Sequence, residues 1–166
     1  MNELISRRNQ YYLRIFGIYQ IIGATIYLAY FFLNFHFAIF LNVRLFVFFF
    51  SIIGLFCYSI YCGNLCLKPS LDALKYSLIN QLLQVFGFAV FGFVFIYDNG
   101  VRTSLILDLS DSVAITEKIS ILGTDISINA EPEKLEISFN ILAIVFVYWL
   151  DVLIREYKKS LRNKNQ

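Results

Sequence analysis

Four polar side chains share one face of an otherwise apolar stretch near the middle of the chain. Ser77, Asn80, Gln81 and Gln84 recur at steps of three and four residues, the spacing that places side chains on one face of an α-helix. Amides donate and accept hydrogen bonds but offer no useful acid–base chemistry, so this face favours binding over catalysis. Two interpretations stay open: hydrogen bonds between neighbouring helices, or a polar cavity that contacts a ligand inside a membrane.

A carboxylate lies within the last apolar stretch of the chain. Asp151 precedes Arg155 by four residues, which on a helix brings the two side chains together as an ion pair. A charge at the centre of a bilayer costs about 2.5 to 3.5 kcal/mol, and a partner near the end of the stretch reduces that cost. A proton-coupling carboxylate is the alternative, although a relay would need a second titratable group at similar depth.

Two further amides, Gln20 and Asn140, lie in the first and last apolar stretches. The polar candidates inside the apolar stretches are therefore Gln20, Asn80, Gln81, Gln84, Asn140 and Asp151. The chain has no phosphate-binding glycine loop, no HExxH and no GxSxG motif, so we predict neither an enzyme nor a bound cofactor. With a single histidine beside three cysteines, a conventional Cys/His zinc site has no support, and we predict no metal.

The composition and the length of the apolar stretches predict which elements carry these residues. With 58% hydrophobic and 16% charged residues, a chain of 166 residues has more apolar surface than a soluble domain could bury, so lipid must cover the rest. A helix needs roughly 20 apolar residues to cross a bilayer. Four stretches meet that length, at about residues 12–33, 40–62, 74–97 and 137–155. We therefore predict an all-α membrane protein, a four-helix transmembrane bundle that forms a single domain over residues 1–166.

Basic residues predict the orientation of this bundle, because lysine and arginine near membrane spans are retained on the cytoplasmic side. The two termini and the connection between the second and third stretches carry ten of the 14 basic residues. The segment 98–136 carries three basic and eight acidic residues. We expect a multi-pass protein of the plasma (inner) membrane, with both termini cytoplasmic and the acidic loop outside. The basic C-terminal stretch suits anionic lipid headgroups, and we predict no nucleic-acid partner.

The acidic loop changes from a helical pattern to two-residue alternation. Apolar residues alternate with polar ones around Leu105–Leu109, Ile119–Ile121 and Ile126–Ile128, and turn residues separate these segments. This pattern predicts short strands, so the bundle should carry a small extracytoplasmic β-hairpin loop. A partly ordered acidic loop is the alternative.

The segment that begins at Glu136, Ile137 and Ser138 and ends at Asp151 and Arg155 resembles the closing helix of a family of small, uncharacterised four-span bacterial membrane proteins. The resemblance covers about the last thirty residues. In that family, alternating apolar residues lead into a last helix that ends in an acidic residue and an arginine. The resemblance implies a four-helix bundle and no particular activity.

These observations favour a non-catalytic integral membrane protein, an accessory, sensory or protective subunit that recognises a protein partner through the acidic loop 98–136. A small transporter or channel subunit is the alternative, with Gln20, Asn80, Gln84 and Asp151 lining a path. Because four helices make a thin wall for a pore, that alternative requires a homo-oligomer.

Overall fold

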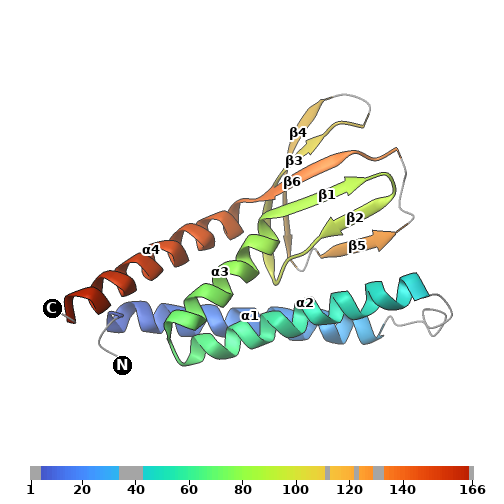
Figure 1. Cartoon of the computed structure of the whole chain (residues 1–166). Helices are drawn as coiled ribbons and strands as arrows, with labels where there is room; N and C mark the ends of the chain where they lie inside the picture. The colour runs from blue at the N-terminus through green and yellow to red at the C-terminus, as the bar shows by residue number, and fades with distance from the viewer. Residues whose placement is uncertain (1–4, 34–42, 111–112, 122–123, 129–132, 165–166) are drawn as a thin grey trace.

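The computed structural model of the chain describes residues 5–33, 43–110, 113–121, 124–128 and 133–164. Within these ranges the chain forms four helices and six strands (Figure 1). In chain order these elements are α1 (Arg7–Leu33), α2 (Val43–Leu67), α3 (Leu71–Val85), β1 (Phe86–Val90), β2 (Phe93–Ile96), β3 (Val101–Asp108), β4 (Ala114–Ile121), β5 (Asp125–Ile128), β6 (Glu136–Asn140) and α4 (Ile141–Lys164). The protein is therefore a mixed α/β structure, and the prediction of an all-α four-span bundle is wrong.

The third predicted span, 74–97, fails at its midpoint. Helix α3 ends at Val85, and the rest of the stretch forms the hairpin β1–β2. Aromatic and β-branched residues are abundant from Phe86 onward, and these side chains favour a strand. The turn between the strands places Phe91 and Gly92 at positive φ, 51° and 79°, as two-residue hairpin turns require. Total hydropathy does not distinguish such a hairpin from a helix.

The fourth predicted span, 137–155, fails for a similar reason. Its first residues belong to strand β6, and α4 begins only at Ile141. Asn140 caps this helix, since its Oδ1 accepts a hydrogen bond from the backbone nitrogen of Ala143 at 3.2 Å. The apolar part of α4 is too short to cross a bilayer alone.

The segment 98–136 is not a small separate hairpin. The three predicted strand segments fall in β3, β4 and β5, so strands at these positions are confirmed. All six strands join one antiparallel sheet in the order β4-β3-β6-β1-β2-β5. Hairpin β1–β2 and strand β6, which sequence hydropathy assigned to helices, occupy its centre.

The two faces of this sheet differ in polarity. Paired residues lie on the same face, and the pairs Arg102↔Ser120, Ser104↔Asn140 and Gly87↔Ser138 place polar groups on one face. The alternate residues form an apolar face, which includes Phe86, Phe88, Phe93, Phe95, Leu105, Leu107, Ile115, Ile119, Ile121 and Phe139. Two-residue alternation thus runs through most of the sheet.

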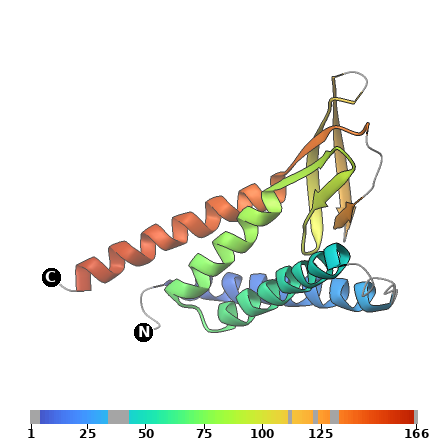
Figure 2. The same ribbon diagram turned by 45° about the vertical axis from the view of Figure 1, so that its right-hand side comes forward.

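Helices α1 and α2 form a long antiparallel pair, and α3 packs beside α4 (Figures 1 and 2). The start of α1, the end of α4 and the connection from α2 to α3 lie at one end of the molecule, and the sheet lies toward the other (Figure 1). At residues 17 and 63 the pair α1–α2 is so close that a Cβ on Gly63 would lie 2.6 Å from the carbonyl oxygen of Gly17. Ser70 caps α3, as its position before the helix predicts, by accepting a hydrogen bond from the nitrogen of Ala73 at 3.1 Å.

Two helical segments in the described ranges are long and apolar enough to cross a membrane, Arg7–Leu33 and Phe49–Leu67. They correspond to the predicted spans 12–33 and 40–62, apart from residues 40–42, which lie outside the described residues. Only a third of each span's apolar window is buried inside the protein.

Candidate functional site

The predicted polar face of α3 is buried where the helices meet the sheet. Ser77, Asn80, Gln81 and Gln84 are all buried, against α2 on one side and the turn after β2 on the other. The Ser77 hydroxyl lies 3.0 Å from the Cys66 sulfur. The spacing of these residues along α3 therefore does form one inward face.

Asn80 lies at the centre of a hydrogen-bond network. Its Nδ2 donates to the Ser59 hydroxyl on α2 at 2.8 Å. The Tyr97 hydroxyl lies 3.2 Å from Asn80 Oδ1 and 3.0 Å from the Leu55 carbonyl oxygen, and can donate to either. Burial raises the pKa of the Tyr97 hydroxyl, which keeps it protonated as a donor.

A second set of hydrogen bonds connects the network to the turn that leaves β2. The Asn99 side-chain amide donates to the Ser59 hydroxyl, and the Asn99 backbone nitrogen donates to Gln84 Oε1 at 3.2 Å. Gln84 also bonds to the Asn80 carbonyl oxygen at 3.2 Å. The polar groups therefore hold two helices and the sheet together, as interhelical hydrogen bonds would, and neither of the two cavities described below is lined by them.

Gln20 and Gln81 are less well satisfied. Gln20 on α1 is fully buried, and neither its Oε1 nor its Nε2 has a hydrogen-bond partner among the described residues. The same is true of Gln81 Nε2, within the part of the chain that the structure covers. Each such group costs about 1 to 3 kcal/mol relative to a satisfied one.

The remaining predicted residues lie away from this cluster. Asn140 serves as the cap of α4 described above. Asp151 and Arg155 form an ion pair of 2.5 Å on the partly exposed surface of α4. The structure thus gathers Asn80, Gln81 and Gln84 but leaves Asp151 apart from them.

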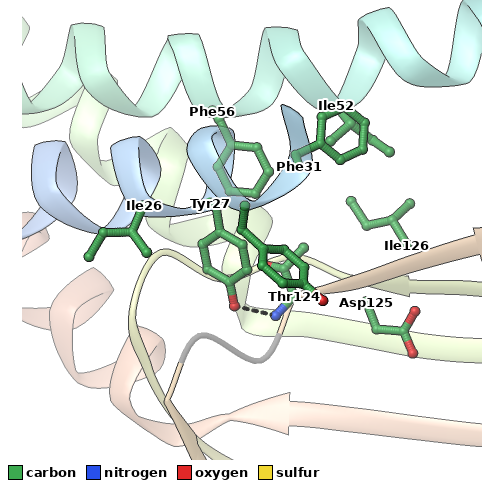
Figure 3. A pocket seen from close by; sticks show the side chains of 9 residues that line it. Ile26, Tyr27, Phe31, Ile52, Phe56, Thr124, Asp125 and Ile126 are labelled. Carbon is green, nitrogen blue, oxygen red and sulfur yellow. Dashed lines mark hydrogen bonds between the residues drawn. The ribbon is translucent and has the colours of Figure 1, made fainter. Parts of the chain in front are cut away.

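A cavity of about 460 Å³ opens between the pair α1–α2 and the start of β5 (Figure 3). Its walls are mainly apolar and aromatic, from Phe31, Ile52, Phe56 and Ile126. Its polar lining residues are Tyr27, Tyr30, Thr124 and Asp125. The Tyr27 hydroxyl accepts a hydrogen bond from the Thr124 backbone nitrogen at 2.5 Å. The mainly apolar lining suits an apolar group.

A smaller cavity of about 140 Å³ lies over the polar face of the sheet. Lys118 and Ser120 of edge strand β4 line it together with Asp125 of the opposite edge strand β5, so the sheet curls around this face. Arg102 is the buried cation of this cavity. Burial lowers the pKa of Arg102, and the negative charge of Asp98 raises it.

Sequence reasoning missed Ser59, Tyr97, Asn99 and Arg102. Ser59, Tyr97 and Asn99 join the network through contacts between distant parts of the chain, which no local pattern indicates. The two-residue spacing of Arg102 and Ser104 was the one available signal, because it places both side chains on a single face of a strand.

Comparison with protein-family models, with curated proteins and with solved structures finds no match for the chain. The resemblance of the C-terminal segment to small four-span membrane proteins stays a prediction.

Proposed function

We propose that the protein is a non-catalytic integral membrane protein, an accessory, sensory or protective subunit whose α1–α2 pair lies in the bilayer and whose segment 98–136 recognises a protein partner. One observation carries the membrane part of this proposal. Ile15, Ile18, Ile22 and Ile26 follow one face of α1 at helical spacing and are each 44 to 53% exposed. A continuous exposed isoleucine stripe is costly in water and is accommodated by lipid.

The distribution of charge supports an orientation for the pair. Basic residues near the start of α1, in the connection from α2 to α3 and near the end of α4 lie at one end of the molecule (Figure 1). This end suits the anionic cytoplasmic leaflet of the plasma membrane. With two crossings, the start of α1 and the chain after α2 lie on the same side of the membrane, so the proposal places both termini in the cytoplasm.

Strand β4 supports the partner-binding part of the proposal. It is an edge strand, so one side of its backbone is open to pairing. Ile115, Ile119 and Ile121 on its apolar face are 67 to 75% exposed. An edge strand with such a face is typical of a surface that another protein covers.

A pair of matched double substitutions tests both parts. Ile18→Glu with Ile22→Glu places charges on the proposed lipid face, whereas Ile119→Glu with Ile121→Glu makes the same chemical change on β4. We expect the first variant to lose retention in membranes during alkaline carbonate extraction and the second to remain in them. Wild-type protein released by carbonate would contradict the membrane assignment.

Photocrosslinking tests the partner surface directly. A photoreactive amino acid at position 115 should give a protein adduct of defined mass in intact membranes. We expect Ile119→Glu with Ile121→Glu to abolish that adduct without changing membrane retention. A defined adduct that forms equally well in this variant would exclude β4 as the recognition surface.

A further inference from the structure

Arg102 is buried on the polar face of the sheet, and one nitrogen of its guanidinium is unpaired among the described residues. Its side chain is 2% exposed. Nε donates to the Ser104 hydroxyl at 3.0 Å and Nη2 donates to the Ser138 hydroxyl at 2.7 Å. Nη1 has no hydrogen-bond partner among the described residues. The buried carboxylate of Asp98 lies close enough for its negative charge to raise the Arg102 pKa. A guanidinium stays protonated in proteins, so this charge cannot be removed by titration.

Gly87 leaves the room that the guanidinium occupies. A Cβ at this position would lie 2.8 Å from Arg102 Nη2 and 2.5 Å from the Ser138 hydroxyl oxygen. Any side chain here would displace the guanidinium or the serine that positions it. The strands β1, β3 and β6 are thus built together around a cation with one unpaired donor group.

Further cationic and hydroxyl groups surround the same cavity. Lys118 lies opposite Ser104 in the β3–β4 pairing, and Ser120 lies opposite Arg102. Lys134 is paired with Glu136 at 3.2 Å, so these two charges offset each other. Asp125 is the one other carboxylate among the residues that line the cavity, against the two cations Arg102 and Lys118. The lining of the cavity therefore carries one more positive than negative charge beside serine donors, while Asp98, outside the lining, offsets part of the charge of Arg102.

We propose that this cavity binds a small oxyanion of phosphate or carboxylate size. Its volume of about 140 Å³ equals roughly four to five waters at about 30 Å³ each, which suits one such group. Arg102 and Lys118 supply charge to the anion, and Ser120 and Ser138 supply hydroxyl donors. The inference goes beyond the proposed function, because it needs neither a bilayer nor a protein partner.

The test uses purified full-length protein at constant ionic strength, titrated with inorganic phosphate against chloride. We expect the ³¹P resonance of phosphate to broaden when phosphate binds to the protein. Phosphate should also raise the thermal unfolding temperature of the protein in a saturable way. Lys118→Gln should weaken the apparent affinity about fivefold to tenfold, since charge-assisted hydrogen bonds are the strong ones. Lys75→Gln, which removes an exposed cation from α3, should leave the affinity unchanged.

Two additional variants keep the proposal testable if substitution of the buried arginine prevents folding. Gly87→Ala and Ser120→Ala should each weaken phosphate binding while the protein still unfolds cooperatively. A titration with acetate separates the two oxyanion classes, because the preferred anion should saturate at the lower concentration. Absence of saturable binding of either anion, or equal affinities in Lys118→Gln and Lys75→Gln, would overturn the proposal.

These outcomes are separable from those of the proposed function. Lys118 lies on the polar face of β4, opposite to Ile119 and Ile121. Lys118→Gln should therefore retain both carbonate resistance and the crosslinked adduct while it loses phosphate affinity.

Discussion

Tyr97 shows how one side chain can connect three parts of the molecule. It leaves the end of β2, is fully buried, and places its hydroxyl between the backbone of α2 and the amide of Asn80. Its ring also meets Phe56 edge-on, at a centroid distance of 5.5 Å. The aromatic body and the polar tip are therefore both used, as is usual for buried tyrosine.

Removing the Tyr97 hydroxyl tests the network at the scale of a single residue. Tyr97→Phe should destabilise the protein by about 1 to 3 kcal/mol, because it leaves an acceptor in the interior without its donor. Thermal unfolding of purified protein would measure the loss. Tyr148→Phe, at an exposed position on α4, should change stability by less than about 0.5 kcal/mol. Equal effects of the two substitutions would show that the buried hydroxyl contributes nothing specific.

At the scale of residues, the sequence predicts the polar side chains of α3 but not the residues that form hydrogen bonds with them. The three-and-four spacing of Asn80, Gln81 and Gln84 identifies a buried face, since polar groups on an apolar helix turn inward. The same reasoning offers nothing for Ser59 or Asn99, because each joins the network only when the turn after β2 packs on α2. The predicted ion pair of Asp151 with Arg155 is present on α4, because a spacing of four residues brings the two side chains together on one helix.

At the scale of elements, hydropathy found the apolar segments but not their conformation. Residues 71–96 form a helix followed directly by a hairpin, with no polar residue at the change from α3 to β1. Alternation of Phe86 and Phe88 with Gly87 and Ala89 was visible in the sequence, yet all four residues are apolar, so a two-residue period has little contrast. In the segment 98–136 the contrast between isoleucine and charged or serine residues is large, and strands there were predicted.

The cap of α3 can be tested within this element. Ser70→Ala should cost about 1 kcal/mol, because the backbone nitrogen of Ala73 loses its acceptor. Ser70→Asp keeps an acceptor at the same place and should restore most of the stability. Thermal unfolding would measure both. A Ser70→Asp protein as unstable as Ser70→Ala would indicate that the hydroxyl acts through another contact.

The close approach of α1 and α2 gives a second test, with a control on the same helix. A Cβ at residue 63 would lie 2.6 Å from the Gly17 carbonyl oxygen, whereas a Cβ at residue 54 would meet nothing within 4 Å. Gly63→Ala should therefore destabilise the pair by about 1 to 3 kcal/mol. Gly54→Ala should be neutral or stabilising, since alanine favours a helix by up to about 1 kcal/mol over glycine. Thermal unfolding that ranks the variants in the reverse order would contradict the observed crossing.

At the scale of the whole molecule, the sheet packs on the α1–α2 pair around the middle of α1. The carbonyl oxygen of Asn99 lies directly against Gly23 of α1, so closely that a side chain at residue 23 would collide with the backbone. Nearby, Thr124 bonds to Tyr27. Both contacts connect strand ends to the middle of α1.

Gly23→Ala should separate these two parts without unfolding either. Its Cβ cannot be accommodated unless the turn at residues 98–100 moves away from α1. Hydrogen–deuterium exchange should therefore rise at residues 98–100 and 124–126, while amides inside α1 and α2 keep their protection. Unchanged exchange in the turn would show that the sheet does not pack on α1 at this glycine.

The junctions of α3 with β1 and of β6 with α4 have a mechanical consequence. Each helix continues into its strand without an intervening residue, and the two strands are hydrogen-bonded neighbours, with Phe86 opposite Phe139. The helices and the sheet are thus joined by two covalent connections that lie side by side and are held together by the hydrogen bonds between β1 and β6. Such a junction resists bending and twisting better than a single flexible linker would. A tilt of α3 and α4 at the basic end should therefore rotate the sheet together with these two helices, as one rigid body.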